Sequence, residues 1–428
     1  MASRPNLEAL DSIRRSEDKP GCESMTDHGK VGFITQAETR KAQEKIPELG
    51  IGMLGYAFMG KAHSNAFKKI SYIFWPPSAI PKLAAISGRD ESKLSEAARR
   101  YGYSKYYTDW KKLVRDPEVE LFDNATPTDM HAEPSIEAAE QGKHVFCEKP
   151  LARSAREAKT MLQAVRKAHV RNMVGFNYRF IPAVQVARKL IKGGTLGRIY
   201  HFHGRYLQEW IMDPGFPLVW RLRKERAGLG ALGCIGPHVV DLAHFLVGNL
   251  STVSAITRTF IHDRPLEDDP TKMGKVDVDD AFESVVEFEG GAIGHISSSR
   301  FAAGRKNYQH VEIYGENGSI LFNLEKLNEL QVHLRNHDIK DLTSSFHDTL
   351  VTESFHPYWE KWWPHGHIMG WEHAMVHEMY HFINAIMTDT DVSPLGANFE
   401  DGYKCNVVLD AIAESANTGR KVQVDHSI

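Results

Sequence analysis

The sequence predicts an α/β protein with two domains. The first is a doubly wound parallel sheet, and the second is an α+β domain with a large, mostly antiparallel open sheet. The chain has 428 residues, and single hydrophobic cores rarely extend beyond about 250–300 residues. Apolar strands alternate with helices in the first half, which is typical of βαβ units. Hairpin signals follow one another in the second half, which favours antiparallel pairing.

The first domain is expected over residues 46–177. Short apolar strands are predicted at 51–54, 83–86, 121–125, 144–147 and 173–176. Helical stretches separate them, at 59–70, 93–101, 110–114, 133–141 and 155–168. Strands and helices at this spacing form a parallel sheet with helices on both faces. We therefore predict a Rossmann dinucleotide-binding domain.

The second domain is expected over residues 178–397. Its β-rich segments lie at 199–206, 252–260, 281–289, 291–299, 310–315 and 319–323. Glu289-Gly290-Gly291 and Glu316-Asn317-Gly318 are typical of hairpin turns. One face of such a sheet can pack on helices. Residues 398–428 are predicted to form a last helix, over 398–415, and a tail.

Residues 1–45 are polar and charged and contain too little apolar surface for a core. We predict that they form an extension of the fold. Two interpretations stay open: a disordered leader, or an arm that wraps a neighbouring subunit or the cofactor.

Composition excludes several classes of partner. A formal net charge of −3 gives no electrostatic basis for binding nucleic acid or a membrane surface. The sequence has no apolar run near the roughly 18 residues of a membrane helix, and its start lacks a signal-peptide apolar core. The cysteines, Cys22, Cys147, Cys234 and Cys405, have no paired spacing, which favours free thiols in a reducing compartment. We expect a cytoplasmic protein.

The first functional motif is the turn Gly55-Tyr56-Ala57-Phe58-Met59-Gly60, which follows an apolar strand and begins a helix. It matches the G-x-G-x-x-G fingerprint with Ala57 in place of the middle glycine. Backbone N–H groups at such a helix start bind a pyrophosphate. We expect cofactor contacts from Gly55, Ala57, Phe58 and Met59. The Ala57 methyl group is expected to hold the phosphates slightly further out.

Three more motifs follow in order: Cys147-Glu148-Lys149-Pro150, Gly175-Phe176-Asn177-Tyr178-Arg179, and a G-A-L-G-C-I-G-P-H stretch at 230–238. Together the four motifs resemble the glucose–fructose oxidoreductase/inositol dehydrogenase (Gfo/Idh/MocA) family over residues 48–415. The residues around the first turn are similar to those of the levoglucosan and glycoside 3-dehydrogenase branch. The resemblance implies hydride transfer between a sugar or polyol and a nicotinamide. It also implies a last helix that returns to the first domain, and a homo-oligomer formed through the outer sheet face.

The adenosine end of the cofactor site departs from the usual pattern. An acidic residue normally ends the second strand and binds the ribose hydroxyls, but Gly88 aligns with that position. Arg89 is expected to stack on adenine or to meet a 2′-phosphate, while Asp90 can still reach the ribose. NADP therefore stays open, and NAD is favoured because the branch uses NAD. The resemblance places Thr126, Pro127 and His131 beside the nicotinamide ribose.

Lys149 is the first candidate for the base or proton relay in alcohol oxidation, because desolvation at a strand end helps a lysine to release its proton. The resemblance supports this role. Glu148 is expected to orient Lys149 or to contact the cofactor. His238 is the second catalytic candidate. The family pattern has an aspartate four residues before this histidine, where this chain has Cys234. Either Lys149 and His238 suffice, with Cys234 a small residue on the substrate side, or activity is reduced or altered.

Substrate contacts are expected from two regions. Asn177 and Arg179 follow the last parallel strand, and both can hydrogen-bond sugar hydroxyls. Trp220 resembles a substrate-side element of the family. A later stretch rich in tryptophan and histidine contains His367 and Trp371. Its indole faces can stack on sugar rings, or its aromatic side chains can pack between domains or subunits.

One motif has a competing interpretation. His377-Glu378-Met379-Tyr380-His381 matches the H-E-x-x-H signature of zinc proteases. An apolar stripe on one helical face, with the histidines on the other, predicts an ordinary amphipathic helix. Proteolysis would also leave the dinucleotide domain unexplained. We predict no metal site.

These observations predict an NAD-dependent enzyme that oxidises a ring hydroxyl of a hexose, anhydrosugar or glycoside to a keto group, at carbon 3 by resemblance. Two alternatives stay open. One is a redox-neutral oxidoreductase whose cofactor never leaves. The other is a sugar- or nucleotide-binding sensor that has lost catalysis, for which Cys234 is the sequence support.

Overall fold

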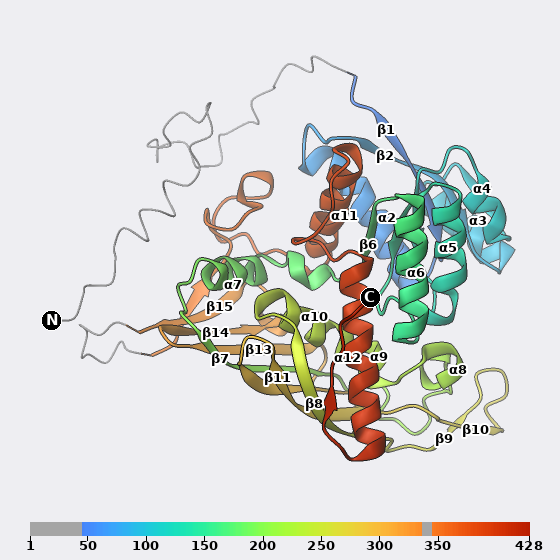
Figure 1. Cartoon of the computed structure of the whole chain (residues 1–428). Helices are drawn as coiled ribbons and strands as arrows, with labels where there is room; N and C mark the ends of the chain where they lie inside the picture. Colours follow the sequence, from blue (N-terminus) through green and yellow to red (C-terminus); the bar gives the residue numbers. More distant parts are fainter. Residues whose placement is uncertain (1–44, 336–344) are drawn as a thin grey trace, which may run out of the picture. The chain divides into compact units, whose positions relative to one another are not determined.

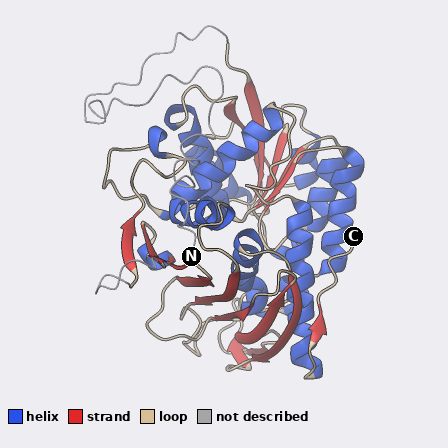
Figure 2. Cartoon of the chain, turned by 60° about the vertical axis from the view of Figure 1, so that its left-hand side comes forward, coloured by secondary structure: helices blue, strands red, loops and turns tan. Residues whose placement is uncertain are grey.

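A computed structural model describes residues 45–335 and 345–428. The predicted extension over residues 1–45, including Cys22, therefore lies outside the described residues, apart from Lys45. The described chain contains a parallel sheet and a larger mixed sheet, both visible in red in Figure 2. This arrangement confirms the predicted fold class.

Within the described residues, the first sheet has six parallel strands in the order β3-β2-β1-β4-β5-β6. They are β1 (Glu48–Leu54), β2 (Ile80–Ser87), β3 (Lys105–Tyr107), β4 (Leu121–Asn124), β5 (His144–Cys147) and β6 (Asn172–Val174). The helices are α2 (Phe58–Ile73), α3 (Glu91–Tyr101), α4 (Trp110–Arg115), α5 (Ala132–Glu140) and α6 (Ala155–Ala168). The five predicted strands are confirmed with small changes at their ends. Strand β3 was missed because it is short and polar.

Local sequence explains where several of these helices begin and end. The side chains of Asp90, Asp109 and Ser154 accept hydrogen bonds from backbone N–H groups of the first turns of α3, α4 and α6. Such caps satisfy donors that would otherwise lack a partner. Helix α3 ends at Gly102, whose φ of 85° suits glycine.

The second sheet has nine strands within the described residues, in the order β16-β15-β14-β13-β7-β12-β11-β8-β17. They are β7 (Ile199–Leu207), β8 (Leu250–Arg258), β11 (Ala281–Phe288), β12 (Ile293–Ser299), β13 (Tyr308–Gly315), β14 (Gly318–Asn323), β15 (Glu329–Leu334), β16 (His347–Leu350) and β17 (Val422–Gln423). All neighbours pair antiparallel except β7 and β12. The two predicted hairpin turns join β11 to β12 and β13 to β14. A separate two-stranded sheet pairs β9 (Asp263–Pro265) with β10 (Met273–Lys275).

Helices lie on one face of this sheet, as Figure 1 shows for α7 (Pro182–Lys192), α10 (Gly236–Leu246) and α12 (Phe399–Thr418). The short helices α8 (Lys224–Ala227) and α9 (Ala231–Cys234) precede α10. Helix α12 also contacts the first domain, because the Asn406 amide donates a 2.8 Å hydrogen bond to the Ala152 carbonyl. Helix α11 (Trp371–Met387) follows β16 in sequence but packs on α2 of the first domain.

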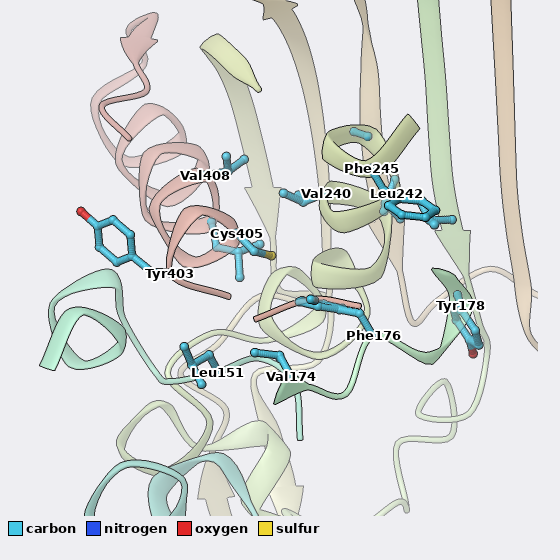
Figure 3. Close-up of a cluster of buried hydrophobic side chains, with 14 of the residues drawn as sticks. Leu151, Val174, Phe176, Tyr178, Val240, Leu242, Phe245, Tyr403, Cys405 and Val408 are labelled. Carbon is cyan, nitrogen blue, oxygen red and sulfur yellow. The ribbon is translucent and has the colours of Figure 1, made fainter. Parts of the chain in front are cut away.

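The main hydrophobic cluster runs through both sheets and their helices without interruption. Figure 3 shows part of it, with side chains of α12 and α10 above residues that follow β5 and β6: Cys405, Val408, Val240, Leu151 and Phe176. The two halves of the chain therefore share one core.

No single helix of the described chain is long and apolar enough to cross a membrane. By length and composition alone, the bent pair Lys224–Cys234 and Gly236–Leu246 passes the same test. Residues of α10 in that pair are mostly buried in the core.

Candidate active site

A cavity of about 730 Å³ lies at the carboxyl edge of the parallel sheet, where such sheets bind ligands. One wall comes from the loops after β1, β4, β5 and β6. The opposite wall comes from β7, the segment around Trp220, and α9 and α10. Most predicted site residues line this cavity: Ala57, Phe58, Met59, Thr126, Pro127, Glu148, Lys149, Asn177, Trp220, Cys234, His238 and Trp371.

The turn after β1 is shaped by its glycines. Gly55 has a φ of 104°, and a Cβ there would lie 2.8 Å from the Ala125 carbonyl oxygen. A Cβ on Gly60 would lie 2.1 Å from the Gly55 carbonyl oxygen. Both positions therefore require glycine. Ala57 occupies the N-cap position of α2, so the free N–H groups of this helix start border the cavity. Backbone donors at a helix N-terminus can hold a pyrophosphate.

The loop after β2 lies beside this turn, since the Gly55 N–H donates to the Ser87 carbonyl. Gly88 packs against Tyr56, whose ring a Cβ would approach to 2.2 Å. Asp90 caps α3 and forms a 3.0 Å ion pair with Lys93, which lowers the pKa of its carboxyl group. Arg89 is exposed. These three residues lie outside the lining of the cavity, at the end where the adenosine half of a dinucleotide binds in this fold.

His131 differs from its predicted position beside the nicotinamide ribose. It is buried, with one ring nitrogen 2.9 Å from the Pro150 carbonyl and the other 3.0 Å from the Thr126 carbonyl. Burial lowers the pKa of this imidazole. His131 therefore joins the loops after β4 and β5 from behind, while Thr126 itself faces the cavity.

Lys149 connects the two walls. It follows β5, and its ammonium group donates a 2.9 Å hydrogen bond to the backbone carbonyl of Cys234 at the end of α9. The preceding Glu148 is buried, and one of its oxygens accepts from the Lys149 backbone N–H at 3.2 Å. Two donors on the Lys149 ammonium group are left for a ligand.

His238 lies in the first turn of α10, with its ring 4.4 Å from that of Tyr178. It is 6% exposed, and within the described residues its Nδ1 has no hydrogen-bond partner. Burial, together with the Lys149 charge, holds the pKa of His238 well below its usual value. The imidazole is therefore neutral, and its unpartnered Nδ1 can accept a hydrogen bond from a ligand hydroxyl. Cys234 lines the cavity one turn before it.

Several predicted substrate residues lie at the cavity. Asn177 is buried, and its Nδ2 has no hydrogen-bond partner among the described residues. Trp220 and Trp371 both line the cavity, and the Trp371 ring stacks on Phe58 with centroids 5.5 Å apart. His367 is exposed and lies outside the lining, so its predicted place in the site was wrong.

Arg179 was also wrongly placed by the sequence. Its guanidinium group is buried behind the cavity and forms a 2.6 Å ion pair with Asp241 on α10 and a 3.3 Å ion pair with Asp401 on α12. Those carboxylates and the Gly396 carbonyl, and not a sugar, receive its hydrogen bonds. Asp241, one turn after His238 on α10, is therefore occupied by Arg179.

Four further lining residues were missed: Tyr206, Gln208, Trp210 and Asn307. The Tyr178 and Tyr206 hydroxyl groups are 2.9 Å apart. The side-chain amide oxygen of Asn307 accepts hydrogen bonds from the Tyr206 hydroxyl group at 2.5 Å and from the Gln208 amide at 2.8 Å. Tyr206 faces inward on β7, and alternation along that strand was the available signal. Asn307 gave no signal, because it precedes β13 in a loop.

The H-E-x-x-H string lies on α11, so the predicted helix is present. His377 and Glu378 are both buried, although the apolar stripe predicted an exposed histidine face. The difference arises because Tyr358 and Trp362 cover that face. The Tyr358 and His377 rings stack at 3.6 Å, and the Trp362 indole donates a 2.6 Å hydrogen bond to His377. Within the described residues, no group of three or more potential ligands could hold a metal ion.

Comparisons with known proteins agree with this geometry. Residues 49–176 match the model described as an oxidoreductase family with an NAD-binding Rossmann fold, and residues 184–321 match the GFO/IDH/MocA C-terminal domain. The chain belongs to the Gfo/Idh/MocA oxidoreductase family. Its first domain is an NAD-binding Rossmann domain.

Individual members of the Gfo/Idh/MocA family are similar to this chain to different degrees. The levoglucosan dehydrogenase of Pseudarthrobacter phenanthrenivorans is 42% identical over 383 residues, 87% of this chain and 97% of that protein. A solved structure of levoglucosan dehydrogenase in complex with NADH and levoglucosan has a TM-score of 0.85 and 43% identity, covering 89% of this chain and all of that one. The myo-inositol 2-dehydrogenase of Thermotoga maritima is 30% identical over 63% of this chain and 74% of that protein.

Proposed function

We propose that this protein is an NAD-dependent dehydrogenase that oxidises a ring hydroxyl of a sugar, anhydrosugar or glycoside to a keto group, with carbon 3 as the position. The decisive observation is that Lys149 and the neutral His238 line one cavity at the carboxyl edge of an NAD-binding sheet. The similarity to levoglucosan dehydrogenase supports the sugar class, since that enzyme has been solved with NADH and levoglucosan.

The residues present fit a nicotinamide cofactor. The bare helix start at Ala57 and the glycine turn before it can hold the pyrophosphate. Thr126 and Pro127 border the cavity further along the sheet edge. When bound, the cofactor accepts a hydride from the alcohol carbon. NAD is favoured because Asp90, the N-cap residue of α3, follows β2 at the adenosine end and the similar solved structures contain NADH.

Alcohol oxidation releases one proton and transfers two electrons as hydride. His238 has an Nδ1 without a partner within the described residues, so it can accept a hydrogen bond from the hydroxyl and take its proton as the hydride leaves the alcohol carbon and the hydroxyl becomes more acidic. Lys149 holds the same hydroxyl oxygen with the donors left after its bond to the Cys234 carbonyl. The pair therefore performs the proton transfer without a carboxylate at position 234.

The remaining walls suit a sugar ring. Trp371 and Trp220 offer apolar faces for its C–H groups, and the free Asn177 amide is a donor for its oxygens. Asn307 and Gln208 add polar groups on the opposite side. Aromatic faces combined with amide groups bind a neutral polyhydroxylated ring better than a charged ligand.

We also propose a homo-oligomer located in the cytoplasm, with support from the second sheet and the thiols. The sheet face opposite α10 exposes Ile256, Val285 and Ile293 on neighbouring strands. These exposed apolar side chains alternate with the charged Glu283 and Glu287 on the same face, and they support a homo-oligomer through it. Cys147, Cys234 and Cys405 are free thiols, which supports a cytoplasmic location.

A coupled assay tests the function. Purified protein is mixed with NAD and levoglucosan, or with a panel of hexoses and glycosides, and NADH absorbance is followed. We expect NADH to form with at least one of them and NMR to show a 3-keto product. Lys149→Met should lower kcat at least about a hundredfold while the Kd for NADH stays nearly unchanged. Lys167→Met, on the exposed end of α6, is the matched control.

Two results would contradict the proposal. Full turnover in Lys149→Met would remove this residue from the chemistry. A nucleotide released only on denaturation, with no response to added NAD, would instead support the redox-neutral cycle.

A further inference from the structure

Three ionisable side chains are buried beside the cavity and have no part in the proton transfer. They are His63 on α2, Asp123 on β4 and Glu148 after β5, with exposed fractions of 0%, 0% and 6%. The His63 Nδ1 lies 3.1 Å from both Asp123 oxygens, and its Nε2 lies 3.2 Å from Glu148 Oε1. The imidazole therefore lies between two buried carboxylates, hydrogen-bonded to Asp123 and within ion-pair distance of Glu148.

The charge of this group follows from its surroundings. Burial alone would lower the pKa of His63, but Asp123 and Glu148 outweigh burial and raise it to about 10. Burial would raise the pKa of Glu148, but His63 and Lys149 lower it. His63 is therefore a cation at neutral pH, and its charge balances that of Asp123. Glu148 then adds one negative charge.

Other titratable groups around Glu148 leave this charge in place. Glu378 on α11 is 1% exposed, its Oε1 has no hydrogen-bond partner within the described residues, and burial raises its pKa well above the usual value. It is therefore a neutral acid. Burial also keeps His131 neutral and the Cys147 thiol protonated. Lys149 is the nearby cation, and its ammonium group is bonded to the opposite wall at Cys234.

Of the three side chains, Glu148 is the one that reaches the cavity. Gly175 leaves space for its carboxylate, because a Cβ at that position would lie 2.9 Å from Glu148 Oε1. Strand β5 lies two strands beyond β1 on the side away from β2. The adenosine half of a dinucleotide binds toward β2 in this fold. Glu148 therefore stands at the nicotinamide end.

We propose that Glu148, kept ionised by the His63–Asp123 pair, makes the site prefer oxidised NAD over NADH. The oxidised nicotinamide ring is a cation and the reduced ring is neutral, so a carboxylate at the wall stabilises the oxidised form. His63 and Asp123 are positioning residues in this scheme and do not touch the ligand. The inference rests on the proposed NAD site.

The primary test compares binding of the two cofactor forms without sugar, by titration calorimetry or protein fluorescence. Glu148→Gln should raise the ratio of the Kd for NAD to the Kd for NADH about tenfold, which corresponds to about 1.4 kcal/mol. The Kd for NADH itself should change little. Glu378→Gln is the matched control, because that acid is already neutral, and its ratio should equal that of the unaltered protein.

The pH dependence of a second variant separates charge from shape. In His63→Gln, the Glu148 carboxyl group loses its cation and becomes protonated near neutral pH. The ratio of the Kd for NAD to the Kd for NADH should then rise as in Glu148→Gln. It should return to the value of the unaltered protein as the pH is raised and Glu148 ionises. In Glu148→Gln the ratio should not return. If His63→Gln fails to fold, the Glu148 and Glu378 variants still decide the question.

The outcomes are distinguishable. An unchanged ratio in Glu148→Gln, or an equal change in Glu378→Gln, overturns the inference and leaves the proposed function intact. Failure of the unaltered protein to bind either NAD or NADH would overturn the proposed NAD site as well.

Discussion

Two buried charge clusters lie on either side of β6, and they differ in one respect. His63, Asp123 and Glu148 join α2, β4 and β5, and Glu148 opens to the cavity. Arg179 joins its own segment after β6 to Asp241 on α10 and to Asp401 on α12. None of that second set is among the lining residues of the cavity in the described chain. Burial and ion pairing are therefore shared by a candidate functional cluster and by a structural one.

The difference shows that access to a ligand, rather than charge alone, marks a candidate functional group. The Arg179 cluster holds the first domain to the helices on the second sheet, across segments far apart in the chain. The His63 cluster uses the same chemistry to keep a carboxylate charged at a cavity wall. The predictions below measure this contrast, in order of expected effect.

Removing the charge of Asp241 should have the largest effect on stability. In Asp241→Asn, Arg179 stays buried and cannot lose its proton, and its charge keeps only the longer contact with the part-exposed Asp401. We expect the free energy of unfolding, measured in urea, to fall by about 3–5 kcal/mol. The NADH affinity of the folded fraction should stay unchanged. A matched exposed pair, Lys82 and Glu118 at 3.3 Å with both side chains 43% exposed, provides the control, and Lys82→Gln should cost no more than about 1 kcal/mol. Equal losses in the two variants would contradict the structural role of the Arg179 cluster.

The His63 cluster should make the free energy of unfolding depend on pH. Because the folded pKa of His63 is about 10 and its ordinary value is 6.5, the folded state binds this proton more tightly than the unfolded state. The stabilisation is fully present below pH 6.5 and decreases as the pH rises toward 10. Urea unfolding across that window should show a falling stability that is flatter in His63→Gln. Parallel curves for the two proteins would argue against a charged, partnered His63.

The smallest effect is expected at Asp401, which shares Arg179 with Asp241. Its side chain is 27% exposed and its contact with Arg179 is longer, at 3.3 Å. Water can therefore solvate the charge, and Asp401→Asn should lower the free energy of unfolding by about 1 kcal/mol. The same urea titration measures this loss. A loss as large as that of Asp241→Asn would mean that the two carboxylates act as one unit.

Much of the Rossmann side of the site was predictable, because its residues follow strand ends. Ala57, Thr126 and Lys149 stand directly after β1, β4 and β5 or in the turns that follow. The carboxyl ends of parallel strands share one sheet edge, so sequence order alone brings them together. The other wall was predicted in part, through His238, Cys234 and Trp220, where family motifs mark the position.

The errors concern residues whose partners are distant in sequence. Arg179 had the right position after β6, but Asp241 and Asp401, which receive its charge, lie on two later helices. Local pattern could not reveal them. His131 was expected at the ligand and instead bonds the Pro150 carbonyl in the next loop. Asn307 was missed because its role depends on Tyr206, which lies 101 positions earlier in the chain.

The sequence alone determined the order of strands and helices, the glycine turn after β1 and the identity of the cofactor domain, because periodicity and turn chemistry act over a few residues. Tertiary structure decided which polar groups face the cavity and which are paired with other protein groups in the interior. It also decided that α11 packs on α2 and that His63 lies between two carboxylates. These outcomes depend on long-range packing, since the charge state of a buried group is set by neighbours that only the folded chain supplies.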